Sequence, residues 1–407
     1  MMHFHDPVRQ LDYLQQCLSQ SRRSIGLFLS AGCPLAVRIQ DNGENKPIIP
    51  DIAGLTKAIR NGFSDSKYKD QFQRIVKHFE DDKHPEPNIE EILSHIRSLH
   101  QVAGSEKVRG LTADELSKLD DEISRKIVEI ADKSLPNNYT PYHKVAMWIG
   151  AIPREEPVEI FTTNYDLLME QALEDFQVPY FDGFTGSRLA FFDSYSMEED
   201  QLPKRWARLW KLHGSINWKQ KNSAVSRSGS EKIDAGEYRY IIHPSHLKYD
   251  ESRRMPYLAM MDRLRSFLKK PSSVLIVNGY SFGDYHLNEI LADGLRGNST
   301  AIIFALVYGK IEKYDNAIKI ACTTHNFNLL AEDEAVIGTR RAAWVEKEKG
   351  EVSEYPEIEW IPKDTNKQDL IKFAHFKLGD FYILGKFLED LIGKEVYEGM
   401  EKKIEIR

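Results

Sequence analysis

One stretch near the middle of the chain constrains the fold more than any other. Residues 158–161 (VEIF) form a β-branched and aromatic run typical of a buried strand, and apolar residues from Leu167 onward take up helical spacing. The polar residues 162–166 (TTNYD) lie where the strand meets the helix, and in open α/β sheets ligands bind at that end of a strand. Asn164 and Asp166 are therefore candidate site residues, although a turn at Asn164 and a helix cap at Asp166 would explain them equally well.

The same alternation of strand and helix patterns recurs along most of the chain. Strand patterns begin near residues 25, 158, 209, 240, 274 and 302, with helical patterns between most of them. That alternation predicts an α/β fold with a Rossmann-like, doubly wound and mostly parallel sheet of about six strands. We also expect a helical insertion at about 61–150, a flexible loop rich in Ser, Gly and Lys at 220–237, and a C-terminal α(+β) extension at 311–407.

Three further strands end in residues that can take part in chemistry. The first strand is followed by small residues at 30–34 (SAGCP), which let the backbone approach a pyrophosphate at a helix start, although no G-x-G-x-x-G fingerprint is present. The strand at 209–212 ends in His213, a candidate acid or base because histidine titrates near neutrality; a packed or surface histidine is the alternative. The strand at 274–277 runs into 278–288 (NGYSFGDYHLN), again a polar turn before a helix.

Composition excludes several classes of protein. A hydrophobic content of 41% and a charged content of 29% are those of a soluble globular protein, and 407 residues are enough for about two or three domains. No apolar run is long enough to span a bilayer, and a net charge of −7 gives no general attraction to nucleic acid or to an anionic membrane. Cys17, Cys33 and Cys322 are far apart and form no CxxC pair, so we expect no metal site and a reducing, cytoplasmic location.

The helical block and the tail carry two further expectations. Apolar residues within 89–99 fall on one helical face, and Thr112 with Glu115 forms a capping box at the start of another helix. We expect these helices to form a wall on one side of the site. In the tail, 358–361 has the pattern of a strand, and 369–400 is interpreted as a helical stretch crowded with aromatic residues. That stretch either packs on the domain's own core or forms an oligomer or partner interface, where aromatic residues are enriched.

Taken in order, these blocks resemble the sirtuin family. Residues 30–34 resemble its glycine-alanine-glycine loop, and 49–51 (IPD) resemble the Ile-Pro-Asp that follows it. Residues 161–166 (FTTNYD) resemble its Thr-x-Asn-x-Asp segment, and 212–214 (LHG) match its catalytic His-Gly. Residues 279–288 (GYSFGDYHLN) are similar to the late Gly-x-Ser loop of bacterial sirtuin-like domains. Each block is weak alone, but together and in family order they are specific.

The chain also departs from the deacetylating sirtuins. Ser30 replaces the first glycine of the early loop, and Ile52 stands where an arginine is expected after Ile-Pro-Asp. No cysteine lies between Gly214 and Gly279, where deacetylases carry a four-cysteine zinc module. These departures are similar to those of bacterial sirtuin-like proteins that hydrolyse NAD in anti-phage defence. In tail length and overall size the chain looks most like the sirtuin subunit that acts with a HerA-type hexameric ATPase.

The resemblance implies hydrolysis of NAD+ to nicotinamide and ADP-ribose, without zinc, as a route to NAD depletion and abortive infection. Within a catalytic domain of residues 1–310, His213 would act as general base and Asn164 would position the ribose or the attacking water. Asp166 would orient the site electrostatically or only cap its helix. Homo-oligomer formation and a HerA-type partner would regulate activity; no membrane is expected, and nucleic acid is not indicated by this chain. Two alternatives stay open: a zinc-free acyl or ADP-ribosyl transferase, and a non-catalytic scaffold that senses nucleotide.

The same resemblance implies a set of contacts with the dinucleotide. The early loop would offer the backbone amides of Ala31, Gly32 and Cys33 to the pyrophosphate, and the late loop would line the adenosine side. The implied contact residues are Ser30, Ala31, Gly32, Cys33, Pro34, Asp51, Thr162, Thr163, Gly279, Tyr280, Ser281, Asp284 and His286.

Overall fold

The fold is seen in a computed structural model of the chain. The described residues are 4–41, 43–84, 86–188, 190–221, 224–227, 239–242, 256–346, 355–361 and 372–392, and for 221, 224 and 239–242 only the backbone is described. The loop expected at 220–237 lies mostly outside these ranges.

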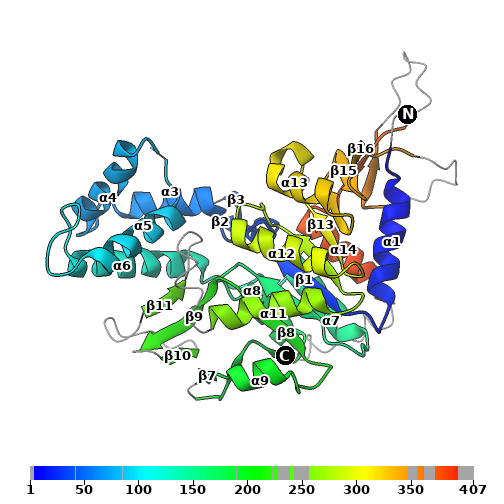
Figure 1. Cartoon of the computed structure of the whole chain (residues 1–407), viewed down its shortest axis with the longest axis horizontal. Helices are drawn as coiled ribbons and strands as arrows, with labels where there is room; N and C mark the ends of the chain where they lie inside the picture. The colour runs from blue at the N-terminus through cyan, green and yellow to red at the C-terminus, as the bar shows by residue number, and fades with distance from the viewer. Residues whose placement is uncertain are drawn as a thin grey trace, which may run out of the picture.

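A nine-stranded sheet forms the centre of the molecule (Figure 1). In spatial order its strands are β16 (Arg340–Ala343), β15 (Glu334–Ile337), β14 (Phe327–Leu330), β13 (Ile302–Leu306), β12 (Val274–Asn278), β1 (Ile25–Leu29), β4 (Glu159–Thr162), β8 (Ala207–Lys211) and β5 (Tyr180–Phe181). Neighbours from β14 to β5 pair in parallel, whereas β15 and β16 add antiparallel strands at one edge. The predicted α/β fold with a doubly wound, mostly parallel sheet is confirmed.

Helices cover both faces of this sheet. One face packs against α1 (Pro7–Ser19), α7 (Pro141–Ala151), α8 (Leu168–Asp175) and α14 (Phe381–Asp390), and the other against α11 (Tyr257–Lys269), α12 (Tyr285–Gly297) and α13 (Asp315–Thr323). Successive residues of β1 show the two layers, because Leu27 belongs to the first core and Phe28 to the second. Burial on both faces is the reason why the central strands are continuous apolar runs.

The helical block forms a lobe with its own core, on one side of the sheet in Figure 1. Its helices are α3 (Ile52–Gly62), α4 (Lys69–Asp81), α5 (Ile89–Val102) and α6 (Ala113–Ala131). The capping box of Thr112 and Glu115 is present at the start of α6, and Asn88 with Glu91 forms another at the start of α5. The next helix, α7, packs instead in the first core of the sheet.

Three smaller sheets complete the described fold. A five-stranded antiparallel sheet has the spatial order β11 (Arg239–Ile242), β9 (Gly214–Lys221), β10 (Ala224–Arg227), β7 (Ala190–Phe192) and β6 (Phe184–Thr185). The two others pair β17 (Ile358–Trp360) with β18 (Ala374–Phe376) and β2 (Arg38–Asp41) with β3 (Glu44–Pro47). Short helical turns lie at α2 (Gly32–Leu35), α9 (Ser194–Glu199) and η1 (Ile311–Lys313).

Two expectations need correction. The strand near residue 240 exists as β11, but it belongs to the five-stranded sheet because it pairs with β9. The helix expected over 369–400 is wrong at its start, where 374–376 form β18: Ala374 and Phe376 are buried while His375 between them is not, which is the two-residue period of a strand. Helix α14 occupies the middle of the range, and residues beyond 392 lie outside the described ranges.

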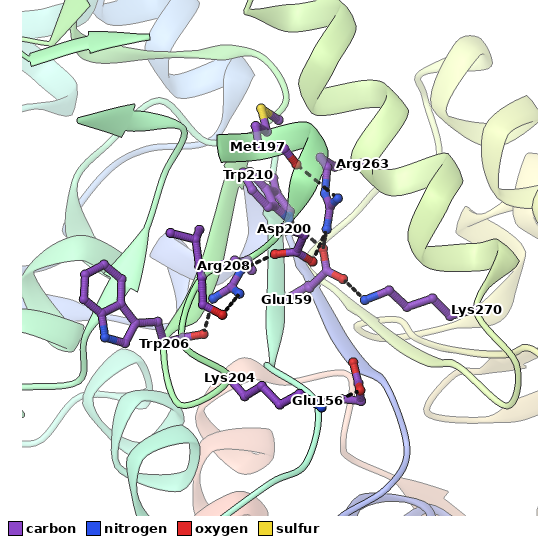
Figure 2. Close-up of polar contacts among 11 residues, drawn as sticks. Glu156, Glu159, Met197, Asp200, Lys204, Trp206, Arg208, Trp210, Arg263 and Lys270 are labelled. Carbon is purple, nitrogen blue, oxygen red and sulfur yellow. Dashed lines mark hydrogen bonds and ion pairs between the residues drawn. The ribbon is translucent and has the colours of Figure 1, made fainter. Parts of the chain in front are cut away.

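A buried charge network (Figure 2) includes Glu159, the first residue of β4, and Arg208, its partner in β8. Glu159, fully buried, accepts hydrogen bonds from the Trp210 indole and from Lys270, each at 2.8 Å, and its Oε2 lies 3.5 Å from Arg263. Asp200 lies 2.9 Å from the guanidinium of Arg263 and 2.9 Å from that of Arg208. The network joins two sheet strands to α11 and to the segment after α9.

Candidate active site

Four polar turns meet at the carboxyl edge of the central sheet. Leu29, the last residue of β1, pairs with Asn278 of β12 on one side and with Thr162 of β4 on the other, and Thr162 pairs with Lys211 of β8. The turns after these four neighbouring strands therefore lie side by side. Later strands of the chain continue from β12, on the opposite side of β1 from β4, so the β1–β12 junction is the topological switch point where such sheets bind ligands.

The two glycine turns at the switch point are in backbone contact. The Gly32 N–H donates to the Gly279 carbonyl at 2.8 Å, and a Cβ atom on Gly32 would lie 2.6 Å from the Gly279 Cα. Gly279 has φ +69°, and a Cβ there would lie 2.7 Å from the Cys33 nitrogen. Only residues without a side chain permit this approach, so glycine is required at both positions.

A cavity of about 280 Å³ opens beside this contact. Its lining includes ten of the predicted site residues: Ser30, Ala31, Pro34, Thr163, Asn164, Asp166, His213, Tyr280, Ser281 and Asp284. The helical lobe supplies the opposite wall through Ile52, Leu55, Asn88, Glu90 and Ala131, as expected of a wall on one side of the site. The Tyr165 hydroxyl donates to Glu90 at 3.3 Å and joins the lobe to the turn that carries Asn164.

Hydrogen bonds hold the Asn164 turn against the Ser30 turn. The Asn164 side-chain amide donates to the Ser30 carbonyl at 3.2 Å, and the Ser30 and Thr163 hydroxyl oxygens lie 2.5 Å apart. The Thr162 hydroxyl accepts from the Asn164 N–H at 3.0 Å, so Thr162 supports the turn from beneath rather than lining this cavity. Asn164 is therefore fixed by contacts on both sides.

His213 faces a carboxylate. Its Nε2 lies 3.3 Å from Oδ2 of Asp284, and both side chains are buried. Asp284 also caps α12, because its Oδ1 accepts from the N–H groups of His286 and Leu287. A histidine oriented by a carboxylate has the arrangement of a positioned acid or base.

The contacts of Asp166 are compatible with both roles that the sequence left open, a helix cap and a site residue. Its Oδ1 accepts from the Leu168 N–H at 3.0 Å at the start of α8, and the residue also lines the cavity. Burial raises the pKa of this carboxyl to about 6, and the nearby Lys211 ammonium opposes the rise. The Lys211 ammonium hydrogen-bonds the Asp166 carbonyl and, at 2.8 Å, the Glu170 carboxylate.

A second cavity, of about 690 Å³, shares Ser30, Ala31, Ile52, Tyr280 and Ser281 with the first. Gly32, Gly279 and the helix cap Asp51 line this second cavity but not the first, so the glycine contact forms part of its wall. The two cavities are therefore adjacent and share part of one wall.

Part of the expected set has other roles. The N–H groups of Gly32 and Cys33 donate to the carbonyls of Gly279 and Ser30 at 2.8 Å each, so both amides already have partners within the protein, and their contact with a pyrophosphate stays a prediction. Cys33 is buried and lines neither cavity, and burial raises the pKa of its thiol. His286 is likewise absent from both linings.

Sequence patterns missed several lining residues. Asn88 and Glu90 of the lobe, and Tyr308, Phe381 and Tyr382 beyond the last predicted site block, line the two cavities. Asn88 caps α5, and this structural role accounts for an asparagine at that position without any role in a site. The three aromatic residues lie next to no recognisable motif. Within the described residues, no group of three or more His, Cys, Asp or Glu side chains is placed to hold a metal ion. Among the helices described, none is long and apolar enough to cross a membrane.

Comparison with known proteins gives a family likeness over part of the chain. Residues 158–353 match the model of the SIR2-like domain. This range contains Asn164, Asp166, His213 and the late glycine turn, whereas the early turn at 30–34 precedes it. No curated protein matches.

Several solved structures of Sir2 proteins also resemble the chain at low identity. One, described as a Sir2 homologue–NAD complex, has 11% identity and a TM-score of 0.37 and covers 98% of this chain and 97% of its own. Another, from work on the mechanism and regulation of Sir2 enzymes, has 12% identity and a TM-score of 0.36 and covers 74% of this chain and 86% of its own.

Proposed function

We propose that this protein hydrolyses NAD+ to nicotinamide and ADP-ribose. The observation that carries the proposal is the joint placement of Asn164 and His213 in one cavity, which adjoins a second cavity lined by the glycine contact. The ordered sirtuin-like blocks and the SIR2-like match support NAD+ as the substrate. The nicotinamide ribose would occupy the smaller cavity and the adenosine half the larger one.

Each polar residue of the smaller cavity has a task in this reaction. Cleavage of the bond between nicotinamide and ribose builds positive, oxocarbenium-like charge on the sugar, so nearby carboxylate and amide oxygens favour it. The Asp166 carboxylate would offset that charge, and Asn164 would position the ribose or the attacking water. His213, oriented by Asp284, would accept a proton from water or from a ribose hydroxyl. The products balance as nicotinamide, ADP-ribose and one proton.

Release of nicotinamide from NAD+ by the purified protein tests the proposal. His213→Ala and Asn164→Ala should each lower the rate on the order of a hundredfold or more, because each removes acid–base or positioning catalysis. His325→Ala, at an exposed histidine outside both cavities, is the matched control and should retain the parent rate. Parent-like rates for both site variants would refute the assignment. An acyl-ADP-ribose or a labelled acceptor protein would instead favour transfer, and NAD+ bound but unchanged would favour a sensor.

We further propose that the hydrolysis depletes NAD in the cytoplasm during anti-phage defence, in a homo-oligomer that assembles with a HerA-type ATPase. The likeness to the defence-associated sirtuin subunit supports this setting. The test is nicotinamide release with and without the ATPase and phage-derived triggers, together with particle mass in solution. A monomeric mass at assay concentration would contradict the homo-oligomer. A rate of nicotinamide release that the ATPase does not change would contradict regulation by that partner.

A further inference from the structure

The C-terminal segment Leu378–Tyr382 reaches back to the candidate active site. Gly379, Asp380, Phe381 and Tyr382 line the second cavity together with the late glycine turn and Tyr308, which follows β13. This segment lies beyond the range that matches the SIR2-like model and outside every sirtuin-like block of the sequence. The cavity is therefore built partly from the tail.

Asn278 ties this segment to the switch point. Its side-chain amide donates to the carbonyls of Leu378 at 3.2 Å and Gly379 at 3.3 Å, and the residue is buried at the end of β12, next to Gly279. One side chain thus joins the tail to the turn that lies between the two cavities.

Packing fixes the segment from two other directions. A Cβ atom on Gly379 would lie 2.0 Å from the Val307 carbonyl oxygen, so the backbone there rests directly on the end of β13. Phe381 is buried and meets the Tyr142 ring edge-to-face, with ring centroids 5.0 Å apart. Helix α14 continues from Phe381 and packs on α7.

The aromatic residues of this wall remain accessible. Tyr382 is 45% exposed and Tyr308 is 66% exposed, although both line the cavity. Tyrosine faces of this kind bind flat heteroaromatic rings by stacking, and a purine is the largest such ring in a dinucleotide substrate. The cavity also shares five lining residues with the one that holds His213, so the two are adjacent, as the two halves of an extended ligand require.

We propose that Tyr382 is a substrate-binding residue that stacks on the adenine of the substrate, and that Asn278 is the positioning residue that holds its segment there. The inference rests on the proposed function, because that function supplies an adenine-containing substrate.

Tyr382→Ala tests the proposal through binding as well as turnover. The dissociation constant for ADP-ribose, measured by calorimetry, and the KM for NAD+ should both rise about tenfold, the size expected for loss of one base–aromatic stack. The kcat should stay at the parent value because the chemical step lies in the other cavity. Tyr382→Phe keeps the ring and should bind ADP-ribose as the parent does. Tyr195→Ala, at an exposed tyrosine of α9 outside both cavities, is the matched control.

Gly379→Ala provides a second variant, in which the Tyr382 side chain is not substituted. Its added methyl group cannot fit against Val307, so the segment must move and ADP-ribose binding should weaken as in Tyr382→Ala. Unchanged ADP-ribose affinity in Tyr382→Ala, or no binding of ADP-ribose and NAD+ by the parent, would overturn the inference. A parent that binds ADP-ribose in a Tyr382-dependent manner but releases no nicotinamide would refute the proposed hydrolysis and leave the adenine contact standing. If the parent releases nicotinamide and Tyr382→Ala has the same KM for NAD+, the proposed hydrolysis stands and the adenine contact is refuted.

Discussion

The Nε2 atom of His213 lies 3.3 Å from Oδ2 of Asp284, while Oδ1 of the same carboxylate caps helix α12. One carboxylate thus joins the candidate base to the start of a rigid helix. Asp284→Asn would keep the cap, since asparagine caps helices as well as aspartate, but it would remove the negative charge beside the imidazole. We expect kcat for nicotinamide release to fall by about ten- to hundredfold, the usual cost of losing a partner that orients a functional histidine.

A matched substitution at another helix cap separates the two roles of Asp284. Asp6 caps α1 through the N–H groups of Val8 and Arg9 and lines neither cavity. Asp6→Asn should therefore leave both turnover and the denaturation midpoint close to the parent values. Equal kcat in the two variants would show that Asp284 acts only as a cap.

Asp166→Asn should stabilise the protein while lowering its activity. The folded-state pKa of about 6 lies above the ordinary value of 3.8, because burial disfavours the charged carboxylate. The free energy of unfolding therefore falls as the pH rises from about 4 to about 6, and the full cost of the buried charge is present above that pH. The amide variant avoids that cost, and its oxygen can still accept from Leu168. We expect a gain of about 2 kcal/mol in the free energy of unfolding at pH 8, which shrinks as the pH falls from about 6 toward about 4.

Turnover of the same variant decides between the two interpretations of Asp166. If the carboxylate offsets oxocarbenium charge, nicotinamide release should fall on the order of a hundredfold. Urea denaturation at pH 8 and pH 5, followed beside the turnover assay, measures both effects. A variant with parent-like turnover would reduce Asp166 to a helix cap.

Gly32→Ala should be costly because two backbones meet there. The new Cβ would lie 2.6 Å from the Gly279 Cα, and backbone on that side cannot rotate away. We expect a loss of about 1–3 kcal/mol in the free energy of unfolding together with weaker ADP-ribose binding. Gly297→Ala is the control, since a Cβ there meets nothing within 4 Å. Thermal denaturation that shifts equally in the two variants would contradict the close contact.

Glu159→Gln should destabilise the fold without any direct role in chemistry. The substitution leaves the partly buried Lys270 without its carboxylate partner and removes one of the two carboxylates beside Arg263, which keeps Asp200 (Figure 2). We expect a cost of about 3 kcal/mol, because breaking a buried ion pair from one side leaves an uncompensated charge. Glu156→Gln, in the exposed pair with Lys204 at 3.4 Å, should cost no more than about 1 kcal/mol. Equal denaturant midpoints for the two variants would refute a structural role for the network.

The predictable part of the site follows from strand ends. Asn164 and His213 are separated by many residues, yet both follow buried strands, and parallel strands place their carboxyl ends on one edge. The same logic could not place β11, because a short apolar run does not reveal whether it joins a parallel sheet or pairs with β9. Glu90 and Tyr382 could not be found at all, since each reaches the site through the packing of a helix that begins far from any motif.

The sequence by itself determined the four strands whose ends carry the site, the polar residues that follow them and where two helices of the lobe, α5 and α6, begin. Those features depend on the period of apolar residues and on capping side chains, which act between near neighbours in the chain. Only the tertiary structure decided that Gly32 meets Gly279, that Asp284 faces His213, and that Asn278 holds the tail against the site. Such contacts depend on strand order and on the shape complementarity of distant surfaces, and no local pattern specifies either.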